Sequence, residues 1–182
     1  MKFRIDRLFY TIVLLLFCSS AFAQPYKTLT INDFRNASNS GGDRSVASTY
    51  CTIEYSFTAR PENDYYMLTF YVKLVMDNNQ SWMDLSKMTS KEMLAEILKH
   101  EQGHYNISYM EQQELLRTVA HTVFRSDYKR VANAIFDRIE AKYKLLNQNY
   151  DADTKNSTDR EQQRSWDAYF QQKLAYMPLA KN

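Results

Sequence analysis

The spacing of apolar residues changes once along the chain, from an alternating pattern to a helical one. Val, Ile, Tyr, Phe and Thr are concentrated in residues 46–58 and 65–76, and the segment between these two runs contains Pro61. Such runs joined by a short polar segment predict a β-hairpin. Residues 28–34 predict a further short strand.

From residue 89 onward, apolar residues recur every three or four positions, which predicts amphipathic helices. Thr89 and Glu92 have capping-box spacing, so a long first helix is predicted to begin there. A second helix is predicted to end near Asn147, before a polar, turn-like segment at residues 150–158. A third helix carries Trp166, Phe170 and Leu174 and is predicted to end at about Met177, before Pro178. We therefore expect an α+β fold, with an N-terminal antiparallel sheet followed by three α-helices.

The first 23 residues have the layout of a targeting segment. A basic start is followed by an apolar run at residues 8–17 and by small residues at Ala21 and Ala23. This layout predicts a secretory signal peptide cut after Ala23. A membrane anchor is the alternative, but the apolar run has about half the roughly 20 residues that a span needs. We therefore expect one mature domain, residues 24–182, that is secreted or periplasmic and not stably inserted in a membrane.

Composition then limits the partners and the sources of stability. The chain has 23 basic and 21 acidic residues. The predicted signal peptide contains three of the basic residues and one of the acidic ones, so the mature chain has 20 of each. This balance gives no argument for nucleic acid as a partner. Cleavage of the predicted signal peptide removes Cys18, so Cys51 has no intramolecular disulfide partner. Cys51 lies in an alternating, strand-like run, which indicates that it is buried as a small hydrophobic residue.

One motif carries chemistry. His100, Glu101, Gln102, Gly103 and His104 form the pattern H-E-x-x-H within the first predicted helix. Residues four apart lie on the same helix face, so both imidazoles can bind one Zn²⁺. Glu101 then lies beside the ion, where it can act as the general base that activates water for hydrolysis. Gly in a helix interior costs roughly 1 kcal/mol relative to Ala, so Gly103 indicates a packing or site requirement.

The motif and its surroundings resemble DUF922, a family of predicted secreted bacterial zinc-dependent proteases. Besides HEQGH, the likeness includes LTINDF at residues 29–34, YDADT at residues 150–154, and the later Gln163 and Trp166. Ile31 stands where the family tends to have Trp. The resemblance implies a zincin-like fold with the motif on the first long helix, and a peptide or protein substrate.

Several residues compete for the position of third zinc ligand, since a catalytic zinc normally has three protein ligands and a water. The resemblance implies His at position 156, but the chain has Asn156, whose neutral amide is a poor ligand. Asp151 and Asp153 offer carboxylates, although both also suit turn or cap positions. His121 lies about 25 Å beyond His104 along an unbroken helix and reaches the metal only if the chain reverses.

Other groups near the motif have weaker roles. Glu111 and Glu114 are expected on a solvated face of the helix. Residues 65–76 are the predicted sheet edge along which an extended substrate binds. The Tyr residues nearest in sequence to the motif are candidate transition-state donors, with a buried structural role favoured for each: Tyr105, Tyr109 and Tyr150.

The sequence thus predicts a secreted or periplasmic zinc metallopeptidase with His100 and His104 as metal ligands and Glu101 as general base. The second interpretation is a noncatalytic zincin-like binding or scaffolding module with a weakened metal site. A metal-free helical interaction protein is the third.

Overall fold

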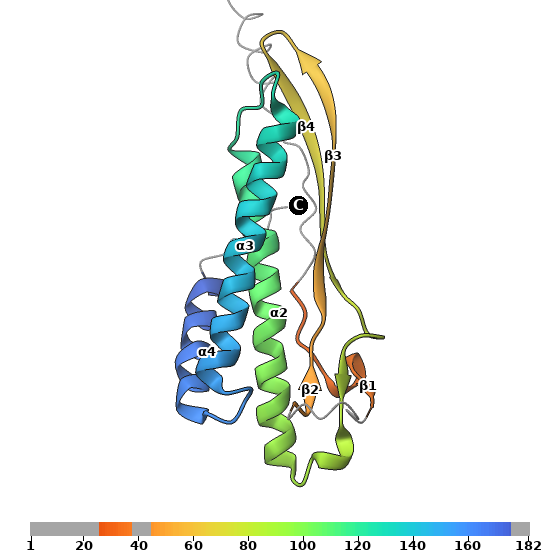
Figure 1. Ribbon diagram of the computed structural model, residues 1–182, viewed down its shortest axis with the longest axis vertical. Helices are drawn as coiled ribbons and strands as arrows, with labels where there is room; N and C mark the ends of the chain where they lie inside the picture. The colour runs from red at the N-terminus through yellow and green to blue at the C-terminus, as the bar shows by residue number, and fades with distance from the viewer. Residues whose placement is uncertain (1–25, 38–44, 176–182) are drawn as a thin grey trace, which may run out of the picture.

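A long β-hairpin lies beside three helices in the computed structural model, which describes residues 26–37 and 45–175 (Figure 1). The hairpin consists of β3 (Cys51–Glu62) and β4 (Tyr65–Met76), which pair antiparallel from Cys51 opposite Met76 to Glu62 opposite Tyr65. Only residues 63–64 form the turn, and Pro61 lies within β3. The predicted hairpin is confirmed, with a shorter loop than the sequence suggested.

The helices run along the inner side of this hairpin. The first, α2 (Lys91–Ala120), is unbroken over 30 residues, and α3 (Tyr128–Thr154) returns antiparallel beside it (Figure 1). The shorter α4 (Arg160–Ala175) packs against both. Ser90, rather than Thr89, is the N-cap of α2, because its side chain accepts a hydrogen bond from the Met93 amide.

A second, smaller sheet lies near the start of α2. Its strand order is β1 (Arg35–Asn36), β5 (Trp82–Met83), β2 (Ala47–Ser48), with β1 parallel and β2 antiparallel to β5. In the described part of the chain, a β-region is therefore followed by three helices, which confirms the α+β prediction. The β1–β5 pair departs from the all-antiparallel sheet that we expected.

Two hydrophobic cores share α2. One lies between the inner face of the hairpin and all three helices, and the other lies between the small sheet and the first half of α2. The first core includes Val72, Met110, Leu115, Ile139 and Phe170. The second includes Leu29, Leu74, Met83, Ile97 and Tyr105. Because burial of each such side chain contributes about 1.5–3 kcal/mol, α2 is anchored on both sides of the motif that it carries.

The strand predicted over residues 28–34 is wrong. This segment contains the 3-10 helix η1 (Ile31–Asp33), and β1 begins only at Arg35. The Asp33 carboxylate accepts hydrogen bonds from the backbone N–H and the hydroxyl of Thr30. These local bonds close a turn that competes with an extended backbone.

The predicted end of the second helix near Asn147 is also wrong, because α3 continues to Thr154 and includes most of the supposed turn. Tyr150 and Thr154, one turn apart, are both fully buried, and this packing outweighs the modest helix propensity of Asn and Asp. Lys155, the C-cap that follows Thr154, has a left-handed φ of 48° and stops the helix. Asp151 therefore lies on α3, one helical turn beyond Asn147.

The predicted signal peptide lies outside the described residues, as do residues 176–182, where the third helix was expected to end. No helix in the described part of the chain has the length and apolarity that crossing a membrane requires.

Candidate metal centre

Three ligand atoms from two helices converge at one point. The two H-E-x-x-H histidines on α2 direct their Nε2 atoms toward each other, 3.2 Å apart. Asp151 Oδ1, from α3, lies 3.4 Å from His100 Nε2 and 3.1 Å from His104 Nε2. Ligand atoms about 2.0–2.1 Å from a tetrahedral Zn²⁺ lie about 3.3–3.4 Å apart, so this triangle fits one face of a zinc coordination shell.

The tautomer of His100 is set by a buried glutamine. Gln163 Nε2 donates to Asp167 Oδ1 at 3.0 Å, which turns the amide oxygen of Gln163 toward His100. That oxygen lies 3.2 Å from His100 Nδ1, so Nδ1 carries the proton and donates. The Nε2 of His100 is then left with a free lone pair, as a metal ligand requires.

Asn147 has the same role for His104. Its Oδ1 lies 2.8 Å from His104 Nδ1, which assigns the proton to Nδ1 and the lone pair to Nε2. Two lone pairs and a carboxylate oxygen at these distances repel one another unless a proton or a cation lies among them. The supporting hydrogen bonds thus prepare the site for a positive charge.

The titration behaviour of the site points the same way. Burial alone lowers the pKa of His104, but its hydrogen bond to Asp151 and the charges of Glu101 and Asp151 outweigh this effect and raise the pKa. For Asp151, burial raises the pKa, and the hydrogen bonds to the two imidazoles hold it well below its ordinary value. The surroundings of these groups therefore favour a cation.

Glu101 lies beside the triangle rather than at its third corner. Its carboxylate is within 4.8 Å of the ligand nitrogens of His100 and His104, and the residue is only 3% exposed. Thr49, in the segment between β2 and β3, donates its hydroxyl to Glu101 Oε2 at 2.7 Å. This bond orients the carboxylate and leaves Oε1 for a proton.

Gly103 meets a steric requirement on the opposite side of the motif. Tyr150 stacks on the His100 ring, with centroids 4.7 Å apart and planes at 17°, and donates to the His100 carbonyl at 3.0 Å. A Cβ on Gly103 would lie 2.2 Å from the Tyr150 hydroxyl oxygen. The packing reason expected for Gly103 is therefore the close approach of Tyr150, which supports His100 from behind.

The alternative third ligands are placed differently. Asn156 follows α3, within three successive left-handed residues, and lines the pocket in front of the triangle, but no hydrogen bond within the described residues joins its side chain to either imidazole. Asp153 accepts a hydrogen bond from Trp166 Nε1 at 3.1 Å and links α3 to α4. His121 caps the far end of α2. Asp151 is thus the candidate that reaches both histidines.

Of the other candidate residues, the two glutamates differ from the expected solvated face, whereas Cys51 and the three Tyr residues agree with the buried roles favoured for them. Glu114 pairs with Lys142 and accepts a hydrogen bond from the Tyr143 hydroxyl at 2.9 Å, so it is not simply solvated. Glu111 is half-buried and lines a second pocket. Burial raises the pKa of Cys51 to about 12, which keeps it a neutral thiol. None of the three Tyr candidates lines either described pocket.

A pocket of about 340 Å³ opens in front of the triangle, lined on one side by residues 45–49 and on the other by the first half of α2 and the end of α3. The second pocket continues along residues 49, 51, 52 and 53. Residues 65–76 form an edge strand, because β4 pairs only with β3 among the described strands, but they line neither pocket. Substrate binding along that edge stays a prediction. Among the described strands, β2 pairs only with β5 and β3 only with β4, which leaves each with an edge beside the pockets.

Sequence reasoning missed Thr49 and Asn147 as supporting residues, because both depend on contacts between distant segments. Gln163 was noted only as part of a family likeness, and its role follows from α4 packing against α2.

The fold and the site define an α+β protein in which two helices hold a His-His-Asp group beside a buried glutamate. The chain belongs to the bacterial family of unknown function DUF922, whose model matches residues 28–159. No curated protein and no solved structure matches it. The match includes the whole triangle and ends before Gln163. The family membership predicted from the sequence is confirmed, and the zinc-dependent protease activity stays a prediction.

Proposed function

We propose that the protein is a zinc-dependent metallopeptidase in which His100, His104 and Asp151 hold the ion and Glu101 is the general base. The convergence of two Nε2 atoms and one carboxylate oxygen carries this proposal. Two neutral imidazoles and one carboxylate are a ligand set found in catalytic rather than closed structural zinc sites, because a position is left for water or substrate.

Each residue around the site has a separate task. When bound, Zn²⁺ supplies Lewis acidity that polarises a carbonyl and lowers the pKa of water. Glu101, held by Thr49 at one oxygen, accepts a proton at the other and can deliver it to the leaving amine. Gln163 and Asn147 keep the two Nε2 atoms free of protons. Tyr150 keeps the His100 ring in place.

A peptide is the substrate class that best suits the surroundings. Residues 45–53 form an extended segment beside the triangle, and the free strand edges there can pair with an extended peptide backbone. The zincin-like character is part of this proposal. So is action outside the cytoplasm, which the signal-like N-terminal segment supports.

The test is a comparison of zinc content and peptide cleavage in wild type and three variants. Glu101→Gln is expected to keep zinc while losing general-base catalysis, about 10²–10⁴-fold in rate. His100→Ala is expected to lose zinc and cleavage together. Glu96→Gln, on the same helix and lining neither pocket, is the matched control and is expected to behave as wild type.

The substrates are unfolded proteins and a mixed peptide library. If wild type holds zinc and cleaves nothing that Glu101→Gln leaves intact, the peptidase proposal is wrong. The noncatalytic binding module then takes its place.

A further inference from the structure

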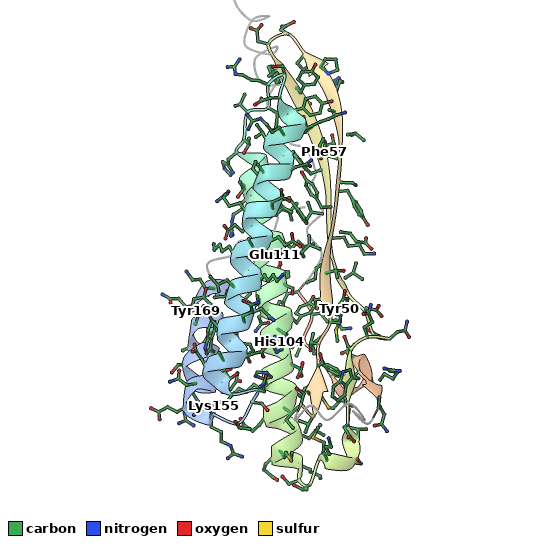
Figure 2. All side chains as sticks on the ribbon, viewed as in Figure 1. Tyr50, Phe57, His104, Glu111, Lys155 and Tyr169 are labelled. Carbon is green, nitrogen blue, oxygen red and sulfur yellow. The ribbon has the colours of Figure 1, made fainter. Side chains whose placement is uncertain are left out.

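A second pocket of about 590 Å³ lies between α2, α3 and the start of β3. It shares Thr49, His104 and Asn147 with the pocket in front of the metal triangle, so the two form one continuous groove. In Figure 2, Glu111 lies further along α2 from His104, toward the tip of the hairpin. A substrate held at the triangle therefore has a neighbouring space for an adjacent residue.

The walls of this second pocket contain apolar side chains and two glutamates, each about two helical turns from the residues that it shares with the pocket in front of the metal triangle. Ile53, Ile107 and Phe136 line it, together with Glu111 from α2 and Glu140 from α3. Neither glutamate has a hydrogen bond or an ion pair to another described residue. Burial, and then the charge of Glu140, raise the pKa of Glu111 to about 7. Two carboxylates that line one pocket without an ion pair to a described residue are a setting that a cation stabilises.

Lys144 also lines this pocket, but its side chain is exposed and makes no ion pair with either glutamate among the described residues. The net charge of the lining acidic and basic side chains is therefore negative. An acidic ligand side chain would be repelled there, and a neutral one would leave the half-buried Glu111 carboxylate without a partner.

We propose that this second pocket is a substrate subsite for a lysine or arginine side chain within two residues of the scissile bond. The proposal rests on the peptidase function proposed above and names the substrate preference of that same site. An aliphatic stem along Ile53 and Ile107, with its cationic end beside the two glutamates, matches the order of these groups along the helices from His104 outward.

The reach of such a side chain agrees with the spacing along α2. Glu111 lies two helical turns beyond His104, or about 10 Å along the axis. One residue of extended peptide spans about 3.3 Å, and an extended arginine side chain reaches about 6–7 Å from its Cα. Together they cover the distance from the triangle to Glu111, so the basic residue lies next to the scissile bond or one position further.

The test measures binding separately from cleavage. Zinc-loaded mature Glu101→Gln protein, which avoids turnover, is titrated with an arginine-containing hexapeptide and with the same peptide carrying citrulline, a neutral analogue of similar shape. We expect the arginine peptide to bind about tenfold more tightly, since charge-assisted hydrogen bonds are about twice as strong as neutral ones.

In the Glu101→Gln protein, a second substitution, Glu111→Gln or Glu140→Gln, should remove most of the affinity difference between the two peptides. Glu96→Gln, which changes a glutamate of α2 outside both pockets, should leave that difference intact. Glu140 is exposed, so its substitution tests the proposal even if Glu111→Gln folds poorly. Equal affinities for the two peptides, no binding of either, or a preference that survives both substitutions would overturn the subsite.

The peptidase proposal is judged separately, by cleavage of the mixed library with wild type. Cleavage without a basic preference leaves the peptidase standing and the subsite wrong. An arginine preference in binding without any cleavage leaves the pocket assignment standing and the peptidase wrong.

Discussion

Gly103→Ala tests the packing that supports the histidines. At an ordinary helix position this change stabilises by about 1 kcal/mol. Here the new Cβ would lie 2.2, 2.4 and 2.6 Å from three atoms of the Tyr150 ring and hydroxyl, against about 3.5–4.0 Å for a normal contact. Tyr150 is fully buried and packed against His100, Trp166 and Phe170, so its ring has little room to move.

The expected magnitude follows from opposing contributions. Overpacking costs about 1–3 kcal/mol. Displacement of Tyr150 also breaks its hydrogen bonds to the His100 carbonyl and to Gln163, each of which contributes about 1 kcal/mol to stability. After subtracting the helix-propensity gain of about 1 kcal/mol, we expect Gly103→Ala to lower the free energy of unfolding by about 2–4 kcal/mol. Zinc affinity should fall as well, because the His100 ring shifts with Tyr150.

The assay is urea unfolding of metal-free protein, followed by far-ultraviolet circular dichroism. Ala141→Gly, at an exposed position in the middle of α3, calibrates the ordinary Ala-to-Gly difference at about 1 kcal/mol. In a Tyr150→Leu background the clash should largely disappear, which gives a coupling energy above about 1 kcal/mol. A Gly103→Ala protein that equals or exceeds wild type in stability would refute the reasoning.

Three further predictions concern other parts of the molecule. Gln163→Leu removes the acceptor for His100 Nδ1–H, so zinc affinity should fall about 10–100-fold in a competition titration, whereas Gln162→Leu, its exposed neighbour, should not change it. The pKa of Glu111 is raised from 4.5 to about 7, so the folded chain retains a proton that the unfolded chain releases, and wild-type stability should fall as pH rises between these values. Glu111→Gln should therefore be more stable than wild type at pH 8 by about 1–2 kcal/mol, allowing for partial exposure, with the difference vanishing near pH 4.5 in thermal melts. Intact-mass measurement of the exported protein should show an N-terminus after Ala23, and an N-terminus at Met1 would contradict the signal peptide.

The fold was predictable where a pattern is long and repeats. The strand over residues 65–76 and the helices marked by a three-to-four spacing follow from packing against one face. The end of α3 was not predictable in this way, because residues 147–154 are rich in Asn and Asp, which favour turns locally. Burial of Tyr150 and Thr154 against α2 and α4 keeps this segment helical, and that packing is a property of the tertiary structure.

The candidate site, like the fold, was predictable only where it depends on local sequence. His100, Glu101 and His104 are set by a spacing that can be read from one helix. From the sequence, Asp151 is expected in a turn, where it is one of several possible ligands. It reaches both imidazoles because α3 continues to Thr154 and places Asp151 on the helix. Gln163 contacts His100 across 63 positions of sequence, a relation that no local pattern contains.

The central claim is that His100, His104 and Asp151 together bind zinc. The most direct test is zinc affinity, measured by competition with a chromophoric chelator, for wild type, Asp151→Asn and Asn156→Ala. We predict about one zinc per wild-type chain, at least tenfold weaker binding in Asp151→Asn, and affinity within about twofold of wild type in Asn156→Ala. A wild-type chain that binds no zinc, or an Asp151→Asn chain that binds it as tightly as wild type, would contradict the claim.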